Sequence, residues 1–163
     1  MKRTFALLLA ILMLAATLVA CGSKTVKSTI DAKYDDGFAK SYANSVSVDS
    51  NGNTTYEFTD EQYEKFTYDY RNSVSSDITS EIAASHDEAY GEFAYISEEK
   101  KAVIVGVHAD EYDESVASVE AAAAAENGFR YFQSISNPVS TISVIYCNAN
   151  NQDEVYGTFE FSI

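Results

Sequence analysis

The chain has 163 residues and a formal net charge of −14 at pH 7, because 25 Asp and Glu outnumber 11 Lys and Arg. This charge excludes nucleic acid as an expected partner, since Lys and Arg side chains must neutralise phosphates, and it disfavours adsorption to anionic lipid headgroups. The length suits one ordinary domain with a hydrophobic core of its own.

Residues 1–20 have the composition of a secretory signal peptide. Lys2 and Arg3 precede an apolar run over residues 5–19, and small residues follow before a cleavage point. The apolar run is too short to favour a permanent transmembrane helix. Removal of residues 1–20 takes Lys2 and Arg3 with it and changes the formal charge from −14 to −16.

The segment Leu18-Val19-Ala20-Cys21 resembles the lipobox of bacterial lipoprotein signal peptides. In that family the cysteine is lipidated, the preceding peptide is removed and the new N-terminus is acylated. The resemblance implies that acyl chains on Cys21 hold the protein at the outer leaflet of the plasma membrane, or at the outer membrane of a cell that has two. The alternative is a plain signal peptide cut near Ala20, which leaves Cys21 as a free thiol.

Residues 21–41 are predicted to form the lipidated cysteine and a flexible tether. Residues 22–41 are small and polar, show little periodicity and carry a formal charge of +1, from four lysines and three aspartates. The alternative is that Ile30 to Phe38 packs onto the domain.

Residues 42–163 are predicted to form a single α+β domain, which begins with a hairpin. Val46 and Val48 alternate with serines, residues 49–53 have turn composition, and Tyr56 and Phe58 resume the alternation. Thr59 and Gln62 then have the spacing of a capping box, which predicts the start of a helix. Its apolar residues recur every three or four positions until the pattern fades near residues 85–87; they are Tyr63, Phe66, Tyr70, Val74, Ile78 and Ile82.

A second hairpin and helix follow the same plan. Phe93 and Tyr95, a charged turn at residues 97–101 and an alternating valine strand at residues 103–107 predict the hairpin. A helix is predicted from about Glu114, where clustered carboxylates complement the positive end of its dipole. Gly128 either ends this helix or lies within it, in which case the helix continues to about Ser134.

A third hairpin completes the predicted fold after Pro138. Its strands contain Ile142, Val144 and Tyr146 on one side of a loop at residues 148–154, and apolar residues of 155–163 on the other. The predicted order is therefore ββαββαββ, a two-layer domain in which a mostly antiparallel sheet of about six strands packs against two helices. The second face of that sheet is expected either to expose a platform of Ser, Thr and Tyr or to be hidden by curling of the sheet.

One set of oxygen-bearing side chains has the spacing of a calcium loop. Asp49, Asn51, Asn53, Glu57 and Asp60 occupy positions 1, 3, 5, 9 and 12 of such a loop. Position 6 is Thr54 instead of the glycine that the loop requires, and a hairpin turn rich in Asn and Asp accounts for the same residues.

His108 and Cys147 are the other candidates for chemistry. His108 with Asp110 and Glu111 could ligate a metal, although His86 belongs to a different element. Cys147 could act as a nucleophile if His108 or His86 approached it, but acidic surroundings disfavour the thiolate.

The sequence lacks the motifs of common hydrolases, phosphate-binding loops and dinucleotide-binding domains. We therefore expect a non-enzymatic, lipid-anchored, extracytoplasmic domain that binds a protein, peptide or cell-envelope component and has no cofactor. The alternatives are an envelope hydrolase with a site of scattered carboxylates and histidines, and a calcium-dependent adhesion or structural module.

Overall fold

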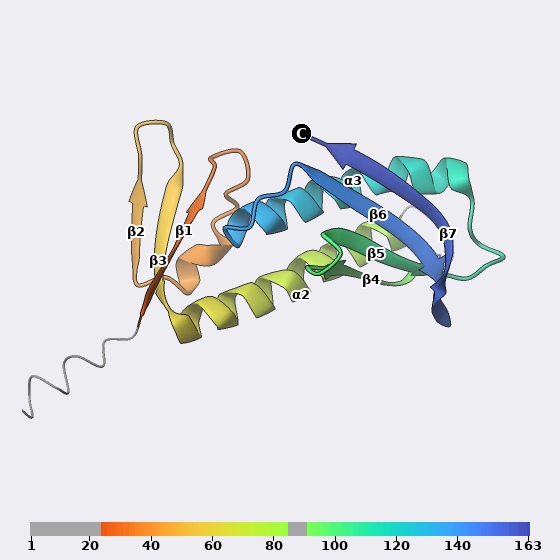
Figure 1. Ribbon diagram of the computed structural model, residues 1–163, viewed down its shortest axis with the longest axis horizontal. Helices are drawn as coiled ribbons and strands as arrows, with labels where there is room; N and C mark the ends of the chain where they lie inside the picture. Colours follow the sequence, from red (N-terminus) through yellow and green to blue (C-terminus); the bar gives the residue numbers. More distant parts are fainter. Residues whose placement is uncertain (1–23, 85–90) are drawn as a thin grey trace, which may run out of the picture.

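A computed structural model describes residues 24–84 and 91–163 of the chain, which form strands, two long helices and a short 3-10 helix (Figure 1). The elements in chain order are β1 (Thr25–Ile30), η1 (Phe38–Ser41), β2 (Ser45–Val48), β3 (Thr54–Thr59), α2 (Asp60–Ala84), β4 (Gly91–Ser97), β5 (Ala102–Val107), α3 (Glu114–Ser134), β6 (Thr141–Asn148) and β7 (Asn151–Ser162). The predicted α+β class, its two helices and its three hairpins are confirmed.

The strands form two sheets, so the prediction of one sheet is wrong. The N-terminal sheet has the order β1-β3-β2 and is antiparallel throughout, whereas the C-terminal sheet has the order β4-β5-β6-β7. Within the C-terminal sheet, β5 and β6 are parallel. Helix α3 joins those two strands as a crossover, which allows parallel pairing that a tight turn cannot provide.

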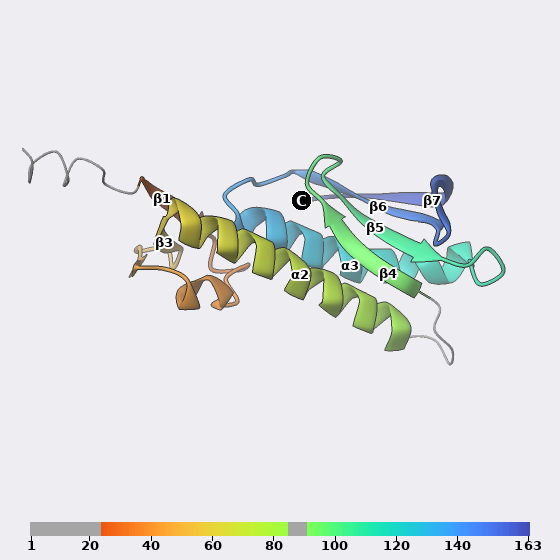
Figure 2. The same cartoon turned by 90° about the horizontal axis from the view of Figure 1, so that it is seen from below.

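The length of α2 explains why the first hairpin does not join the others. β3 continues directly into α2, whose 25 residues span about 37 Å at 1.5 Å per residue. The N-terminal sheet therefore lies at one end of the molecule, while α2 and α3 lie side by side against one face of the C-terminal sheet (Figures 1 and 2).

Helix α2 has the predicted start and the predicted buried stripe. Thr59 Oγ1 accepts a hydrogen bond from the backbone N–H of Gln62 at 3.2 Å, and Gln62 Oε1 accepts one from the N–H of Thr59 at 2.8 Å, which completes the capping box. The buried residues are Phe66, Tyr70, Val74, Ile78 and Ile82. The predicted fading of the helix at residues 85–87 lies outside the described residues.

Helix α3 continues past Gly128 to Ser134. Asp113 caps its start, because Oδ1 accepts hydrogen bonds from the N–H groups of Ser115 and Val116 at 2.8 and 3.2 Å. Gly128 is buried against the side chain of Ile142, and a Cβ at this position would overlap that side chain. The glycine therefore allows the helix to approach β6 closely.

The residues from Thr25 onward belong to the fold, which corrects the prediction of a flexible tether over residues 21–41. β1 pairs with β3 along its whole length, from Thr25 opposite Thr59 to Ile30 opposite Thr54, and Ile30 is only 2% exposed. The alternative, in which Ile30 to Phe38 packs onto the domain, describes this segment better.

The sequence pattern does not predict β1, because a serine occupies one of the buried positions of this strand. Ser28 is fully buried between Val26 and Ile30, so the apolar alternation is interrupted. Its hydroxyl donates a hydrogen bond to the backbone oxygen of Ser134 at 2.6 Å and accepts one from Ser136 Oγ at 2.8 Å. These bonds satisfy a polar group that would otherwise be costly to bury.

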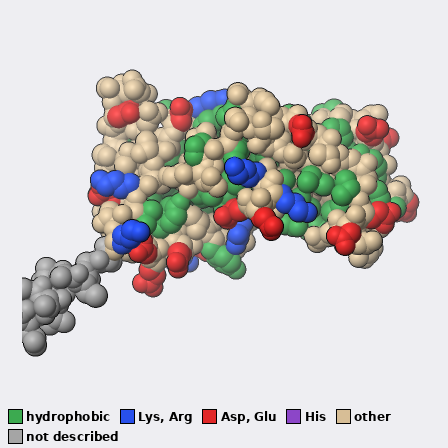
Figure 3. All heavy atoms as spheres, viewed as in Figure 1, with side chains coloured by type: hydrophobic (Ala, Val, Ile, Leu, Met, Phe, Trp, Pro, Cys, Tyr) green, Lys and Arg blue, Asp and Glu red, His purple; other side chains and the backbone are tan. Residues whose placement is uncertain are grey.

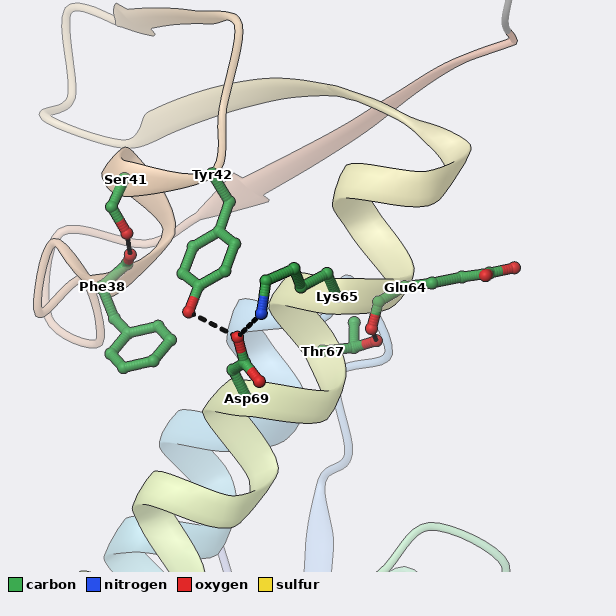
Figure 4. Close-up of polar contacts among 7 residues, drawn as sticks. All are labelled: Phe38, Ser41, Tyr42, Glu64, Lys65, Thr67 and Asp69. Carbon is green, nitrogen blue, oxygen red and sulfur yellow. Dashed lines mark hydrogen bonds and ion pairs between the residues drawn. The ribbon is translucent and has the colours of Figure 1, made fainter.

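Phenol–carboxylate hydrogen bonds hold the segment that follows β1. Tyr56 donates to both carboxylate oxygens of Asp35, at 2.9 and 3.1 Å, and Tyr70 donates to Asp36 Oδ2 at 2.7 Å. In the close-up of Figure 4, the Tyr42 hydroxyl from the end of η1 reaches Asp69 Oδ2 on α2 at 2.8 Å. Lys65 Nζ contacts the same oxygen at 2.6 Å.

Stacked aromatic rings connect the N-terminal sheet to both helices, and we call this set the aromatic seam. It runs from Phe58 on β3 through Phe66 and Tyr70 on α2 to Tyr131 on α3, with successive ring centroids 5.3, 5.6 and 5.9 Å apart. Phe66 and Tyr131 are fully buried. Such pairs add stabilisation beyond the burial of their area.

Phe66→Ala should therefore lower the free energy of unfolding by about 3–5 kcal/mol, because it leaves a cavity in the middle of the aromatic seam. Urea unfolding followed by far-UV circular dichroism measures this loss. Tyr68→Ala is the matched control, since Tyr68 lies on the same helix and is 58% exposed, and it should change stability by less than about 0.5 kcal/mol. Equal losses of unfolding free energy in the two variants would contradict a stabilising role of the aromatic seam.

Alkaline pH should weaken the contact between Tyr56 and Asp35. Burial, together with the hydrogen bond to Asp35, raises the pKa of Tyr56 to about 12. A phenol whose pKa is raised on folding contributes stability that is complete below its unfolded pKa, about 10, and that is lost as the pH rises toward 12.

We expect Tyr56→Phe to cost stability at pH 7 and this cost to shrink between about pH 10 and pH 12, by up to about 1.4 kcal/mol per pH unit. Urea unfolding of both proteins across this range measures the difference. A cost that stays constant with pH would show that the Tyr56 hydroxyl does not keep its proton in the folded state.

Candidate functional site

The C-terminal sheet has a second apolar cluster on the face turned away from the helices. Alternation along a strand sends successive side chains to opposite faces, so Val103 and Val105 of β5 meet the helices while Ala102 and Ile104 point away from them. The open-face cluster comprises Phe93, Ala102, Ile104, Ile145 and Cys147. Figure 3 shows hydrophobic side chains gathered over the C-terminal sheet on the face toward the viewer.

The strands β4, β5 and β6 place this cluster. Phe93 lies against the backbone of Gly106, because a Cβ at Gly106 would overlap the Phe93 ring. Ala102, Ile104 and Cys147 are at most 4% exposed, whereas Phe93 and Ile145 are half-buried. The solvent-accessible surface of the cluster is therefore formed by Phe93 and Ile145, which pack over the three buried residues.

Polar groups border the open-face cluster on the β7 side. Cys147 pairs with Val155 but Asn148 pairs with Asn151, so residues 152–154 bulge out of the ladder. Gln152 in this bulge accepts a hydrogen bond at 3.0 Å from the hydroxyl of Tyr95, which is 37% exposed. Asp153 and Glu154 are exposed beside it, and Glu160 stands on the open face opposite Ser143.

Of the two alternatives for this face, an exposed platform of Ser, Thr and Tyr or a face hidden by curling of the sheet, the platform is wrong at the centre, which is apolar. The sequence contains a signal for it. All six residues of β5, Ala-Val-Ile-Val-Gly-Val, are apolar and buried, and a strand without polar alternation is typical of a sheet with two apolar faces.

Cys147 is a buried structural thiol. It is 1% exposed, and its Sγ donates a hydrogen bond to the backbone oxygen of Val105 at 3.6 Å. Burial raises the pKa of this thiol, which the positive charge of Lys100 opposes only in part. The neutral thiol is therefore favoured, and its packing in the open-face cluster explains its presence.

The proposed calcium ligands in the turn between β2 and β3 bond to one another. Asp49 Oδ1 accepts hydrogen bonds from the backbone N–H groups of Asn51 and Asn53 at 2.8 and 2.9 Å, and its Oδ2 accepts one from Asn53 Nδ2 at 3.0 Å. The bond from Asn53 is the main reason that the pKa of Asp49 is lowered. These bonds close the turn as an Asx motif does.

Glu57 and Asp60 are not brought to this turn. Glu57 pairs opposite Ser45 at the other end of the hairpin, and a strand rises about 10 Å between Thr54 and Glu57. Its carboxylate binds Lys27 Nζ at 2.5 Å and Ser45 Oγ at 2.8 Å, and Asp60 begins α2. Among the described residues, no three His, Cys, Asp or Glu side chains form a group that could hold a metal ion.

The candidate residues His108, Asp110 and Glu111 lie in one turn after β5, where the backbone N–H of Glu111 donates to the backbone oxygen of His108 at 3.1 Å. His108 and Glu111 are half-buried, and Asp110 is exposed. Cys21 and His86 lie outside the described residues. No helix within residues 24–84 and 91–163 combines the length and the apolar character needed to cross a membrane.

A groove of about 550 Å³ lies between α2 and β4 and contains a carboxylate that is already engaged. Glu98 Oε1 accepts a hydrogen bond from the hydroxyl of Tyr131 at 2.7 Å and pairs with Arg71 at 3.2 Å. Glu98, in the turn after β4, therefore contacts both α2 and α3, and its ion pair with Arg71 connects the two walls of the groove.

Comparison with models of known protein families, with curated proteins and with solved structures finds no match for this chain.

Proposed function

We propose that this protein is a lipid-anchored, non-enzymatic interaction domain that binds a protein or peptide partner on the outer side of a bacterial membrane. The observation that carries the proposal is the open-face cluster, an apolar centre on the side of the C-terminal sheet that neither helix covers. The accessible part of this cluster is formed by the half-buried Phe93 and Ile145, beside Tyr95, which is 37% exposed. Accessible apolar side chains with a polar border are typical of an interaction surface.

The membrane anchor is supported by the lipobox resemblance of Leu18-Val19-Ala20-Cys21. Acyl chains on Cys21 would hold the domain at the outer leaflet of the plasma membrane, or at the outer membrane of a cell with two membranes. The partner is accordingly another protein or peptide outside the cytoplasm, or a component of the cell envelope.

The charges around the open-face cluster define the chemistry of the partner. Asp153, Glu154 and Glu160 stand at its border and outnumber the nearby Lys100, whose charge acts on Cys147, in a chain with a net charge of −14. A complementary partner presents apolar side chains at the centre of the contact and Lys or Arg at the rim. Such charges speed association and fix orientation more than they add affinity.

The size of the face indicates a weak and reversible complex. Four strands about 4.8 Å apart and six residues long at about 3.3 Å per residue present roughly 400 Å². A stable interface buries about 800 Å² on each partner. A partner that contacts the open face alone therefore belongs to the transient class.

Photo-crosslinking in cells that produce the lipoprotein tests this proposal. A photoreactive phenylalanine analogue at Tyr95, beside the open-face cluster, should form a discrete adduct, and the same analogue at Tyr68 on α2 should not, although Tyr68 is the more exposed of the two. The yield at position 95 should fall as salt is raised, because salt screens the acidic border. Equal adducts at both positions would argue against a binding site on the open face.

A further inference from the structure

Only a short length of chain separates Cys21, the residue of the proposed lipid anchor, from the first strand of the fold. β1 begins at Thr25 and is paired with β3 over six residues. The bonds of Ser28 to the end of α3 and of Asp35 and Asp36 to buried tyrosines hold the chain that follows. The residues from Thr25 to the end of η1 thus move with the core and supply no tether.

The link that remains is short. Three residues, Gly22, Ser23 and Lys24, separate Cys21 from Thr25. Four Cα-to-Cα steps of at most about 3.6 Å span about 14 Å when fully extended. An acylated Cys21 lies at the membrane surface, so Thr25 lies within about this distance of it.

We propose that the fold stands directly on the bilayer, with the corner formed by Thr25, Thr59, Asp60 and Glu61 as its membrane-facing surface. Thr25 pairs with Thr59, and Thr59 is followed at once by the first turn of α2. The opposite end of α2 and the C-terminal sheet then lie away from the lipid (Figure 1). This orientation rests on the lipid anchor of the proposed function.

The distribution of charge favours an upright domain over one that lies flat on the membrane. Residues 22–41 have a formal charge of +1, whereas residues 42–163 contain 22 acidic and 5 basic residues. The upright orientation brings only Asp60 and Glu61 of the corner close to the headgroups. A flat orientation would bring many more of those carboxylates within about 8 Å of the headgroups, the Debye length at physiological salt, where anionic lipids repel them.

An upright domain restricts where a partner can bind. Helix α2 adds about 37 Å to the short link, so a partner on the open face is engaged within about 50 Å of the lipid surface. A long tether would impose no such limit. The partner is therefore expected to belong to the membrane or to the layer immediately above it.

Headgroup quenching in vesicles tests the orientation. The full lipidated protein is placed in phosphatidylcholine and phosphatidylglycerol vesicles that carry a quencher on the headgroup, with a fluorophore at Asp60→Cys or at Asp110→Cys. Both positions are exposed and lose the same charge, and Cys147 is buried. The dye at position 60 should be quenched several-fold more than the dye at position 110, and equal quenching would overturn the orientation.

A spacer provides the matched control. About 20 Gly and Ser residues inserted after Gly22 have an r.m.s. span of about 25 Å, which should remove most of the contrast between the two dyes. Persistence of the full contrast would overturn the role of the short link.

Mass spectrometry of the N-terminal peptide is done on the same samples. Lipid on Cys21 with equal quenching contradicts the orientation alone, whereas a Cys21 without lipid contradicts the anchor and the orientation together.

Discussion

The aromatic seam along α2 is the contact on which the rest of the structure depends. Phe58 of the N-terminal sheet stacks on Phe66, which stacks on Tyr70, which meets Tyr131 of α3. A three-stranded sheet of short strands has too little core to be stable alone. Its hydrophobic face is buried only because α2 begins within it and continues beneath the C-terminal sheet. The two sheets consequently share one hydrophobic core.

This shared core fixes where the chain enters the fold relative to the open face of the C-terminal sheet. The chain enters the fold at Thr25, α2 leaves the same corner, and β4 returns along α2 to form the edge of the C-terminal sheet. With the proposed lipid anchor on Cys21, a rigid connection between the entry point and the open face would favour partners held close to the membrane. A flexible connection would instead allow the domain to sample a wide volume.

The sequence predicted the elements that obey simple periodicity and missed those that depend on tertiary context. The stripe of α2 and the alternation of β3 were sufficient, because each buries one face. β1 was missed since Ser28 is buried through hydrogen bonds to residues more than 100 positions away. The parallel pairing of β5 with β6 depends on where α3 returns the chain. The apolar run of β5 indicates the open-face cluster, but the sequence-based prediction assigned those residues to one core face only. The calcium-loop spacing did not account for β3, a straight strand between Asn53 and Asp60.

Hydrogen exchange of the backbone amides of β1 tests most directly whether the chain is part of the fold from Thr25 onward. The account predicts that protected amides in β1 exchange with free energies close to those of β5 at the centre of the C-terminal sheet, because one core supports both. Exchange of the β1 amides near the rate of an unfolded chain, with β5 still protected, would contradict it. Residues 25–41 would then be the tether that their composition suggests.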